Sequence, residues 1–519
     1  MPVYHTNSFW NYISNEAETV INKCKGLLTK EWYDFELDEH KQGTFYQEVS
    51  RLTIEGVNYV TIRFPAGLTK YLNSKIALTQ EFSEEPQKYT KETVLEYANI
   101  VKQCNPSFEI RDYQTRAVLA SLNNFQSLIL SSVGSGKTSV MCLLCKILEN
   151  DRILIMNDNN FILDQIYERL LSFDIIDVSW NPGKEPDYTK RIVLLNTSSS
   201  DSRLNRQDPA YLSFLKTVNC YITDEAQGIQ ALTWFEPIFY MDLDNLKRLV
   251  GYSGSPFRNY KHPYNDFQDF ITISILGEPA FIYEMKDTIA DGNIAQPYSY
   301  FIRYNNRPAN IPEQFKDSYF MQYKMNITYN KARNDAGLAM LKFLNQNGIK
   351  TLVSFNNLKP AQKMMKSLVE AGIKAMFICG DNTIYEWIAN KRGTLKLEER
   401  KGTPKDIKVA LENGYNIIFG SVVMDRGVDI EAFQAAVLFS AGKTPIANIQ
   451  RIGRASRKRK TGRNISFIID FRDINGNATF QSHYEQRKQM MKDSGVINIE
   501  KVQDFCTMIE ELSEENKKL

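Results

Sequence analysis

The feature that most constrains this chain is the stretch 131–139, with the sequence SSVGSGKTS. A short apolar run precedes it and an apolar segment with helical spacing follows it, so the stretch links a strand to a helix. In that setting, glycines let backbone N–H groups surround phosphate oxygens, and the positive end of the helix dipole favours the anion. The stretch therefore predicts a phosphate-binding loop, and its context argues against the alternative of an ordinary glycine-rich turn.

The side chains of this loop suit a bound nucleotide and a metal ion. Lys137 supplies a point charge for the outer phosphates, and the hydroxyl of Thr138 can bind Mg²⁺. Ser131 stands where glycine or alanine is usual, which is a mild departure. The predicted nucleotide-binding residues of the loop are Gly134, Ser135, Gly136, Lys137, Thr138 and Ser139.

Composition indicates an ordinary globular protein, with 43% hydrophobic and 24% charged residues. At 519 residues, the chain is long enough for about three domains. Because the net charge is only +2, any nucleic-acid surface must come from local patches. The chain opens without a signal pattern and no apolar run approaches roughly 18 residues, so we expect a soluble, cytoplasmic protein with no membrane partner.

The cysteines favour packing over chemistry. There are seven, an odd number, scattered through apolar runs, which indicates reduced thiols. Cys142 and Cys145 form a CxxC pair, but both lie in the helix after the phosphate loop, where burial is favoured over metal binding. With only four histidines, all far apart, we expect no zinc site.

Apolar patterning predicts three domains. Residues 1–105, with strands expected at 43–49 and 59–64, predict a small α+β domain for packing or recognition. Residues 106–303 alternate short apolar strands with helices, which implies a parallel sheet covered on both faces. In residues 304–519 the alternation starts again without a phosphate loop. The predicted fold class is therefore α/β, with two parallel-sheet domains in tandem and a small N-terminal domain.

An acidic pair follows a buried strand of the first α/β domain. Asp224 and Glu225 begin the sequence DEAQ at the carboxyl end of that strand, where ligands bind in open α/β sheets. Asp224 can hold Mg²⁺ through water while Glu225 polarises the attacking water, the division of work that phosphoryl transfer needs. Such a pair alone is usually a helix N-cap, but the phosphate loop earlier in the domain favours the catalytic interpretation.

Two weaker candidates belong to the same domain. Residues 251–256, GYSGSP, end the next strand, and their hydroxyls can relay between the nucleotide and the second domain, with a simple turn as the alternative. Tyr113 and Gln114 precede the first strand of the sheet. The Gln114 amide can read an adenine edge, so both residues are candidate nucleotide contacts.

Basic residues near the end of the second α/β domain are candidates for contacts to the reacting phosphate. Arg454 and Arg457 are three residues apart and lie on neighbouring turns of one predicted helix. Such a pair can reach across a cleft and stabilise charge developing on the γ-phosphate. A solvated basic helix is the alternative, and it is favoured over contact with a phosphate backbone for Lys458, Arg459, Lys460 and Arg463. Ser421 and residues 425–429, DRGVD, end another strand that faces the same cleft.

Together these segments resemble the superfamily 2 helicases. In order, SSVGSGKT, DEAQ, SGSP, MDRGVDI and QRIGRASR are similar to motifs I, II, III, V and VI of that family. The resemblance implies two RecA-like domains with ATP and Mg²⁺ between them and nucleic acid across their top. It assigns catalysis to Lys137, Asp224, Glu225, Arg454 and Arg457, and Mg²⁺ to Thr138 and Asp224. It also implies that Gln114 reads adenine, and that Gln450, Gly427 and Asp429 contact the nucleotide from the second domain.

A narrower resemblance is to the UvsW branch-migration helicases of phages. LKRLVGYSGSPFR, MKDTIADGNIAQPYSYFIRY and TYNKARNDAG look similar to that family, and TIRFPAGLTKYL resembles its small substrate-binding domain. The implied activity is ATP-driven unwinding and branch migration of forked or junction DNA, moving 3′ to 5′, in recombination, repair and replication. The implied partners are branched DNA and replication or recombination proteins, in the host cytoplasm if the source is a phage.

The chain also departs from the family pattern. DEAQ replaces the more usual DEAH or DECH. The family also often has Pro-Thr before the helix predicted at residues 161–171, and this chain lacks it around Asp158 and Asn159. No residue excludes RNA, so an RNA helicase is one alternative, and the motor subunit of a restriction system is another. A clamp that binds nucleic acid without hydrolysis is a third, although Lys137, Glu225 and Arg454 are intact.

Overall fold

The structure is a computed structural model that describes residues 3–5, 10–34, 39–54, 57–76, 79–81, 89–254, 257, 263–305, 310–316, 318–355, 357–379, 383–390, 393–402, 404–420, 433–439, 456, 458, 463–474 and 478–518. Two compact units make up the chain: Met1–Ser131 with Gly136–Tyr283, and Ser132–Ser135 with Glu284–Leu519. The division into three domains at residues 105 and 303 stays a prediction.

The N-terminal region is a small α+β module in the first unit. Its five-stranded sheet has the order β5-β6-β2-β1-β7, and a separate hairpin pairs β3 with β4. The strands are β1 (Val3–His5), β2 (Trp10–Ala17), β3 (Thr29–Asp34), β4 (Glu39–Thr44), β5 (Gln47–Ile54), β6 (Val57–Pro65) and β7 (Thr79–Glu81). The helices are α1 (Glu18–Leu27), η1 (Ala66–Leu68) and α2 (Thr69–Lys75).

The single strand predicted over residues 43–49 is wrong, because the backbone leaves β4 at Thr44 and enters β5 at Gln47. Tertiary packing explains the break. The N–H of Phe45 donates to the carbonyl of Leu28 at 2.8 Å, and the Phe45 ring packs edge-on against Phe270 with centroids 4.7 Å apart. The ring is therefore packed, partly buried, against the core of the first unit at the point where the chain leaves β4.

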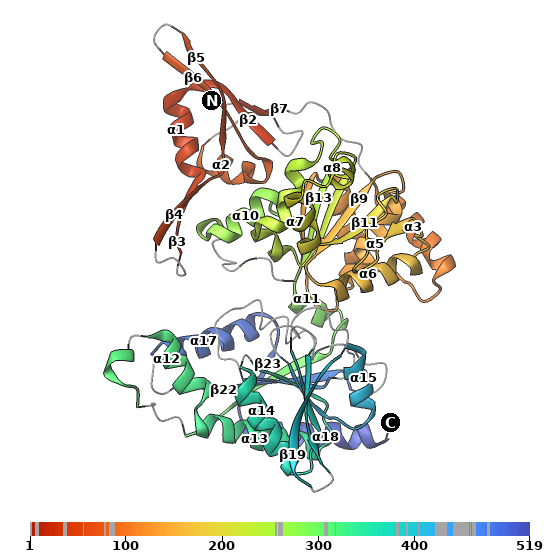
Figure 1. Ribbon diagram of the computed structural model, residues 1–519, viewed down its shortest axis with the longest axis vertical. Coiled ribbons are helices and arrows are strands. Elements are labelled where there is room, and N and C mark those ends of the chain that lie inside the picture. Colours follow the sequence, from red (N-terminus) through yellow and green to blue (C-terminus); the bar gives the residue numbers. More distant parts are fainter. Residues whose placement is uncertain are drawn as a thin grey trace. The chain divides into compact units, whose positions relative to one another are not determined.

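A seven-stranded parallel sheet forms the rest of the first unit, with the order β10-β11-β9-β12-β13-β8-β14 (Figure 1). Its strands are β8 (Gln126–Ser131), β9 (Ile153–Asn157), β10 (Val178–Ser179), β11 (Ile192–Asn196), β12 (Cys220–Asp224), β13 (Arg248–Ser253) and β14 (Pro279–Tyr283). Its helices are α3 (Lys91–Cys104), α4 (Asp112–Asn123), α5 (Lys137–Ile147), α6 (Asn160–Ser172), α7 (Thr197–Asn205), α8 (Pro209–Leu215), η2 (Ala226–Gln230), α9 (Leu232–Phe235), η3 (Glu236–Tyr240), η4 (Pro263–Asn265) and α10 (Phe267–Leu276).

Alternate residues of each strand face opposite layers of this unit, as the period of a strand requires. Ile129 packs under α3, α4, α5 and α6, whereas Leu128 and Leu130 pack under α7, α8, α9 and α10. Cys142 and Cys145 lie in the first of these layers, as their pattern predicts, and burial raises the pKa of both thiols. The N-terminal module shares the second layer with α10.

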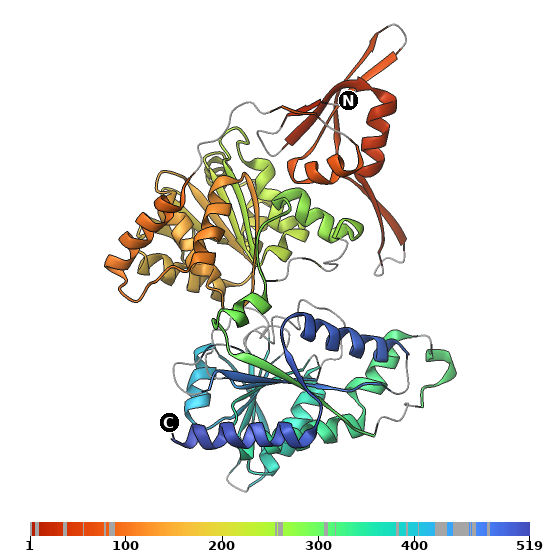
Figure 2. The same cartoon turned by 180° about the vertical axis from the view of Figure 1, so that it is seen from behind.

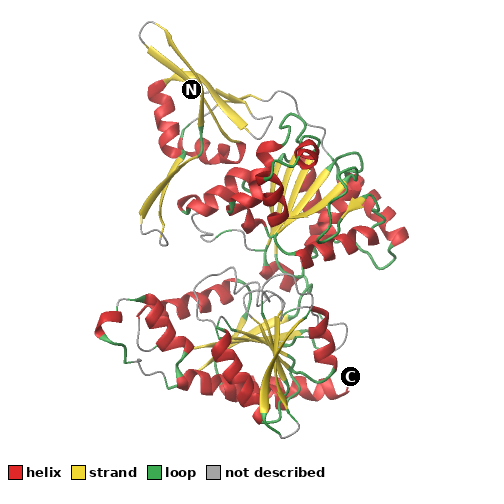
Figure 3. Cartoon of the chain, viewed as in Figure 1, coloured by secondary structure: helices red, strands yellow, loops and turns green. Residues whose placement is uncertain are grey.

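The second unit is built on a nine-stranded sheet with the order β19-β18-β17-β20-β16-β21-β22-β15-β23 (Figure 3). Its strands are β15 (Gln296–Ile302), β16 (Thr351–Ser354), β17 (Ala375–Ile378), β18 (Thr383–Ala389), β19 (Leu395–Lys401), β20 (Ile417–Gly420), β21 (Ala435–Leu438), β22 (Ile465–Phe471) and β23 (Ile497–Ile499). Its helices are α11 (Met285–Ala290), η5 (Glu313–Phe315), α12 (Tyr319–Tyr323), the π-helix η6 (Lys324–Thr328), α13 (Lys331–Gln346), α14 (Leu358–Glu370), α15 (Pro404–Glu412), α17 (Ala478–Asp493) and α18 (Val502–Lys518).

Helices cover both faces of this sheet too. Buried residues of α13, α14 and α18 share one core layer, and those of α11, α15 and α17 lie on the opposite face. Figure 2 shows α18, the blue helix that ends at the C-terminus, running along its face of the sheet. The predicted α/β class with two parallel-sheet domains is confirmed.

An antiparallel hairpin extends the second sheet, and the sequence did not predict it. β18 pairs antiparallel with both β17 and β19. The apolar pattern does not reveal this hairpin because five of the seven residues of β19, LKLEERK, are charged and the strand is exposed. Charged side chains on an edge strand prevent it from pairing with other chains. None of the helices that the structure describes is long and apolar enough to cross a membrane.

Candidate nucleotide-binding site

Strand order brings the predicted residues of the first unit together. β12, β13 and β8 are neighbours in the sheet, and Asp224 pairs with Tyr252 while Ser253 pairs with Leu130. Because these strands are parallel, their carboxyl ends meet at one edge. The acidic pair, Ser253 at the start of SGSP and the start of the phosphate loop therefore share that edge.

The phosphate loop has the backbone that its glycines allow. Gly134 and Gly136 adopt φ values of 83° and 81°, in the left-handed region that other residues avoid. Gly136 is the N-cap of α5, so Lys137 and Thr138 lie in the first turn of that helix. Within the loop, the N–H and the hydroxyl of Ser135 donate to the carbonyl of Ser132 at 3.3 and 2.7 Å. The loop is therefore ordered by its own hydrogen bonds.

The Lys137 ammonium has a hydrogen-bond partner within the loop. Its Nζ donates to the carbonyl of Ser131 at 3.0 Å, so the ammonium folds back along the loop. Ser139 has a partner of its own, because its hydroxyl accepts from Nη2 and Nε of Arg169 at 2.7 and 3.2 Å. Arg169 lies on α6 and sequence reasoning missed it, since nothing in a basic residue 30 positions away signals the contact.

Asp224 and Glu225 are adjacent carboxylates, of which Asp224 is buried and Glu225 is half-buried with a strained backbone. Asp224 is the last residue of β12, and its carbonyl accepts from Nδ2 of buried Asn157 at 2.8 Å. Glu225 has φ 58° and ψ 57°, a left-handed conformation that costs energy and is found mainly at functional sites. Burial raises the pKa of Asp224 well above its usual range, the charge of Glu225 adds to the rise, and the charge of Lys137 opposes it.

Gln227, the last residue of DEAQ, connects Glu225 to the next strand. Its Nε2 donates to Oε2 of Glu225 at 2.8 Å, and its Oε1 accepts from the hydroxyl of Ser253 at 2.7 Å. An amide can donate with one end and accept with the other, which suits a chain of this kind. The departure from DEAH or DECH therefore keeps a group that positions Glu225, and it joins the acidic pair to the SGSP segment.

Gln114 and Tyr113 lie against the loop, in different environments. Oε1 of Gln114 accepts from the N–H of Arg111 at 3.0 Å, and a Cβ at Gly136 would lie 2.6 Å from its Nε2. The Tyr113 ring stacks on Tyr283 with centroids 3.9 Å apart and planes 7° apart. Tyr283 ends β14, a strand that the sequence did not predict, and it covers one face of the ring that was a candidate for nucleotide contact.

The predicted residues of the second unit lie outside the described part of the chain: Gly427, Asp429, Gln450, Arg454 and Arg457. Their roles stay predictions. Ser456, between the two arginines, is described and fully buried, and its hydroxyl hydrogen-bonds that of Ser466 at 2.9 Å. Nη1 of Arg463 donates to Glu511 at 2.8 Å in an exposed pair, which agrees with the solvated interpretation of that residue.

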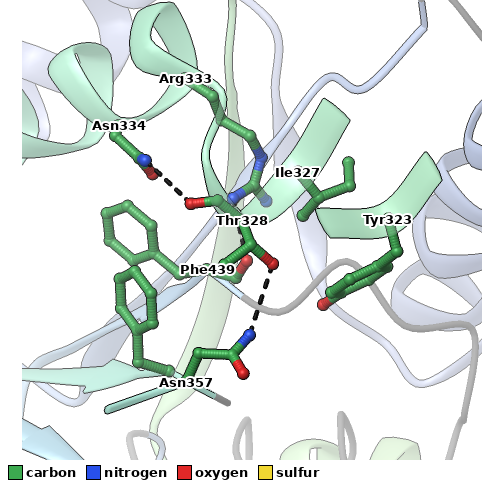
Figure 4. Close-up of a pocket in the computed structure, with 8 residues that line it drawn as sticks. Tyr323, Ile327, Thr328, Arg333, Asn334, Asn357 and Phe439 are labelled. Carbon is green, nitrogen blue, oxygen red and sulfur yellow. Dashed lines mark hydrogen bonds between the residues drawn. The ribbon is translucent and has the colours of Figure 1, made fainter. Parts of the chain in front are cut away.

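A small pocket with both polar and apolar lining residues opens in the second unit where β16 and β21 end (Figure 4). Arg333 lies in its wall, 1% exposed, with Nε on Asp473 at 3.0 Å and Nη1 on the carbonyl of Phe439 at 2.9 Å. Nδ2 of Asn357 donates to the hydroxyl of Thr328 at 3.4 Å. None of the predicted site residues that the structure describes lines this pocket.

Comparison with known protein families agrees with the two parallel-sheet domains. Residues 107–258 match the family described as "Type III restriction enzyme, res subunit", and residues 335–459 match "Helicase conserved C-terminal domain". These two domains, in this order, are those of an ATP-dependent helicase. The chain belongs to the superfamily 2 helicases.

Individual proteins resemble the chain over most of its length. "Putative helicase 22" of Sulfolobus islandicus filamentous virus (isolate Iceland/Hveragerdi) is 23% identical over 90% of this chain and 83% of its own. The fragment structure of "a putative HsdR subunit of a type I restriction enzyme" from Vibrio vulnificus YJ016 is 17% identical, with a TM-score of 0.52 over 93% of this chain and 81% of its own. S. cerevisiae Dbp5 bound to RNA and ADP BeF3 is 13% identical, with a TM-score of 0.51 over 81% and 97%. The solved structures confirm the fold.

T4 UvsW is also among the similar structures. It is 17% identical over 96% of this chain and 98% of its own, with a TM-score of 0.40. A structural similarity at this level does not support the narrower likeness to UvsW, which rests on the sequence segments alone.

Proposed function

We propose that the chain is an ATP-driven motor that unwinds or branch-migrates forked and junction DNA, moving 3′ to 5′. The observation that carries the motor is the meeting of Lys137, Asp224 and Glu225 at the carboxyl edge of one parallel sheet. The choice of forked DNA rests on the resemblance of four sequence segments to the phage branch-migration helicases. In such a role the protein would act in the cytoplasm, that of the host if the source is a phage, beside replication or recombination proteins.

The donor set fits Mg²⁺ bound with ATP. Mg²⁺ takes oxygen ligands, and in nucleotide sites it uses few protein groups besides phosphates and water. The carboxylate of Asp224 and the hydroxyl of Thr138 are oxygen donors of this kind, and Asp224 is 7% exposed. Bound there, the ion would neutralise charge on the phosphates.

The protein groups divide the remaining work. Lys137 and the backbone N–H groups of the phosphate loop bind the phosphates, and Glu225, oriented by Gln227, orients and polarises water. Arg454 and Arg457 stabilise charge on the γ-phosphate from the second domain, with Gln450, Gly427 and Asp429 as further nucleotide contacts. The N-terminal module selects branched duplex.

Stimulated ATP hydrolysis tests this proposal. The full chain is assayed with a fork, a four-way junction, linear duplex, single-stranded DNA and RNA, with Lys137→Ala as the inactive control. We expect forks and junctions to raise kcat most, and 3′-tailed forks to be unwound before 5′-tailed ones. Equal stimulation by RNA would indicate an RNA helicase instead. The similarity of the fold to that of Dbp5 bound to RNA is the observation behind this alternative.

A restriction motor is the second candidate, and the match to a restriction-enzyme family favours it. Such a motor moves along intact duplex and works with a nuclease subunit. Stimulation by long linear duplex above that by forks, together with co-purification of a nuclease from the native source, would select this candidate.

A further inference from the structure

The tip of the phosphate loop is tied to a helix that sequence reasoning left unassigned. Ser132–Ser135 group with the second compact unit. The hydroxyls of Ser132 and Thr288 hydrogen-bond each other, and both residues are buried, at 3% and 0% exposed. Thr288 lies in α11 and also donates to the carbonyl of Glu284 at 2.9 Å. Because a hydroxyl has a single proton, Ser132 is the donor and Thr288 the acceptor.

A second contact holds the same tip. A Cβ on Gly134 would lie 2.8 Å from Cγ2 of Ile294, so the loop backbone and this side chain approach closely. Ile294 is 3% exposed and belongs to the core layer of α17 and β22. The loop tip therefore rests on the segment that begins with α11 and continues to Ala295.

The far end of this segment reaches the stretch that carries the predicted arginine fingers. The N–H of Ala295 donates to the carbonyl of Ser456 at 2.7 Å, and Ser456 is anchored to β22 through Ser466. Between these ends, the N–H of Asn293 donates to the carbonyl of Thr288 at 2.9 Å and closes the turn after α11. Residues 288–295 thus connect Ser132 to Ser456 by hydrogen bonds and packing.

We propose that Thr288 is a positioning residue that couples the phosphate loop to the arginine-finger stretch through residues 288–295. A shift of the loop on nucleotide binding then moves α11, and the segment carries that shift to Ser456. The phosphates themselves are bound by Lys137 and loop N–H groups, so Thr288 acts on turnover more than on affinity. The role rests on the proposed ATP-driven function.

Variants of the full chain isolate the hydroxyl contact. Thr288→Val keeps the shape of the side chain and removes the hydroxyl, Thr288→Ser keeps the hydroxyl, and Ser132→Ala removes the donor. Thr272→Val is the matched control, because Thr272 is also 0% exposed on a helix and also donates to the carbonyl four residues before it, at 3.2 Å. Equal changes in melting temperature for Thr288→Val and Thr272→Val show that fold stability is matched.

Steady-state ATP hydrolysis gives the first readout. We expect Thr288→Val to lower kcat by roughly three- to tenfold, the range of one net hydrogen bond, with KM for ATP within about twofold of wild type. Thr288→Ser should restore kcat, and the double variant with Ser132→Ala should lose no more than the single ones, since both remove one contact. A loss no larger than that of Thr272→Val, or losses that multiply, would overturn the proposal.

Hydrogen exchange gives a readout that needs no turnover. Binding of a non-hydrolysable ATP analogue should change exchange in residues 284–295 of the wild type, and in Thr288→Val it should change exchange in the phosphate loop alone. No change in residues 284–295 of the wild type would also overturn the coupling. If instead no nucleic acid stimulates wild-type hydrolysis, the proposed function fails, while basal hydrolysis and exchange still decide the role of Thr288.

Discussion

At the scale of single residues, backbone strain and hydrogen bonds from neighbouring residues fix the conformation of the acidic pair. Glu225 stands in the left-handed region, directly after the last residue of β12. Gln227 then fixes the carboxylate from one side, and Ser253 fixes Gln227. The orientation of Glu225 thus depends on two residues that do not themselves hydrolyse anything.

Gln227→Ala should lower kcat for ATP by roughly tenfold or more, because a hydrogen bond to a charged group contributes about 1.5–3 kcal/mol. Steady-state hydrolysis measures this. Gln230→Ala is the control, since Gln230 lies in the same short helix and bonds Thr272 instead, at 3.2 Å. Equal losses of kcat in the two variants would show that the loss comes from disturbing the helix and not from removing the hydrogen bond to Glu225.

Asp224→Asn should stabilise the nucleotide-free protein increasingly as pH rises. Burial raises the folded pKa of Asp224 above the roughly 3.9 of an exposed aspartate. The stability of a group with a raised pKa is present below the unfolded pKa and is lost as pH rises through the folded one. The melting-temperature gain of Asp224→Asn over wild type should therefore be larger at about pH 8 than at about pH 5.

Asp187→Asn is the control of opposite sign. The hydroxyl of Thr189 lowers the pKa of Asp187, so this carboxylate adds stability above its unfolded pKa. Asp187→Asn should lose ground to the wild type only as pH rises toward the unfolded pKa of about 3.9, and its deficit should stay constant between about pH 5 and pH 8. The two variants changing in the same direction would contradict the assignment of the Asp224 shift to burial.

At the scale of elements, a buried ion network joins helix ends to strand ends in the second unit. Arg333, in the first turn of α13, bonds Asp473 beyond β22, and Arg487 of α17 bonds both Asp473 at 3.3 Å and Asp470 at 2.7 Å. The Tyr304 hydroxyl bonds Asp473 at 2.6 Å and burial raises its pKa. Two guanidiniums and two carboxylates balance in charge, so α13 and α17 are fixed to the carboxyl end of β22.

Arg333→Met should destabilise the chain by about 3–5 kcal/mol, because it leaves part of a buried charge uncompensated. Thermal or denaturant unfolding measures the change. Arg463→Met is the matched control, since its pair with Glu511 is about half exposed and should be worth about 1 kcal/mol or less. Similar costs for the two would mean that water reaches the pocket beside Arg333.

At the scale of the whole molecule, the proposed motor needs catalytic groups from both parallel-sheet domains. Lys137→Ala should abolish hydrolysis and weaken nucleotide binding. Arg454→Ala should lower kcat by roughly a thousandfold while affinity for a non-hydrolysable ATP analogue is retained, because a finger acts on charge that develops in the transition state. Arg459→Ala, a residue assigned to the solvated helix, is the control and should leave kcat unchanged. Full hydrolysis by Arg454→Ala would remove the second domain from the chemistry.

Much of the fold and the backbone of the phosphate loop could be predicted from sequence, because both depend on residues that are close in the chain. A strand, a glycine turn and a helix that carry GKT are contiguous, so the loop at Lys137 is read from neighbours in the chain. The edge hairpin β18–β19 and the break at Phe45 could not be read in this way. At Phe45, packing against a distant residue determines where the strand ends. In the hairpin, a charged strand pairs at the exposed edge of the sheet.

The sequence by itself determined which chemical groups the chain carries and which strands end beside them. Motif spacing and the period of apolar residues are local properties of the chain. Only the tertiary structure decided their partners. Ser253 meets Gln227 from 26 residues away, Arg169 meets Ser139 from 30, and Thr288 meets Ser132 from 156. Those meetings depend on which strands are neighbours and which helix faces pack, and neither is written in the order of residues.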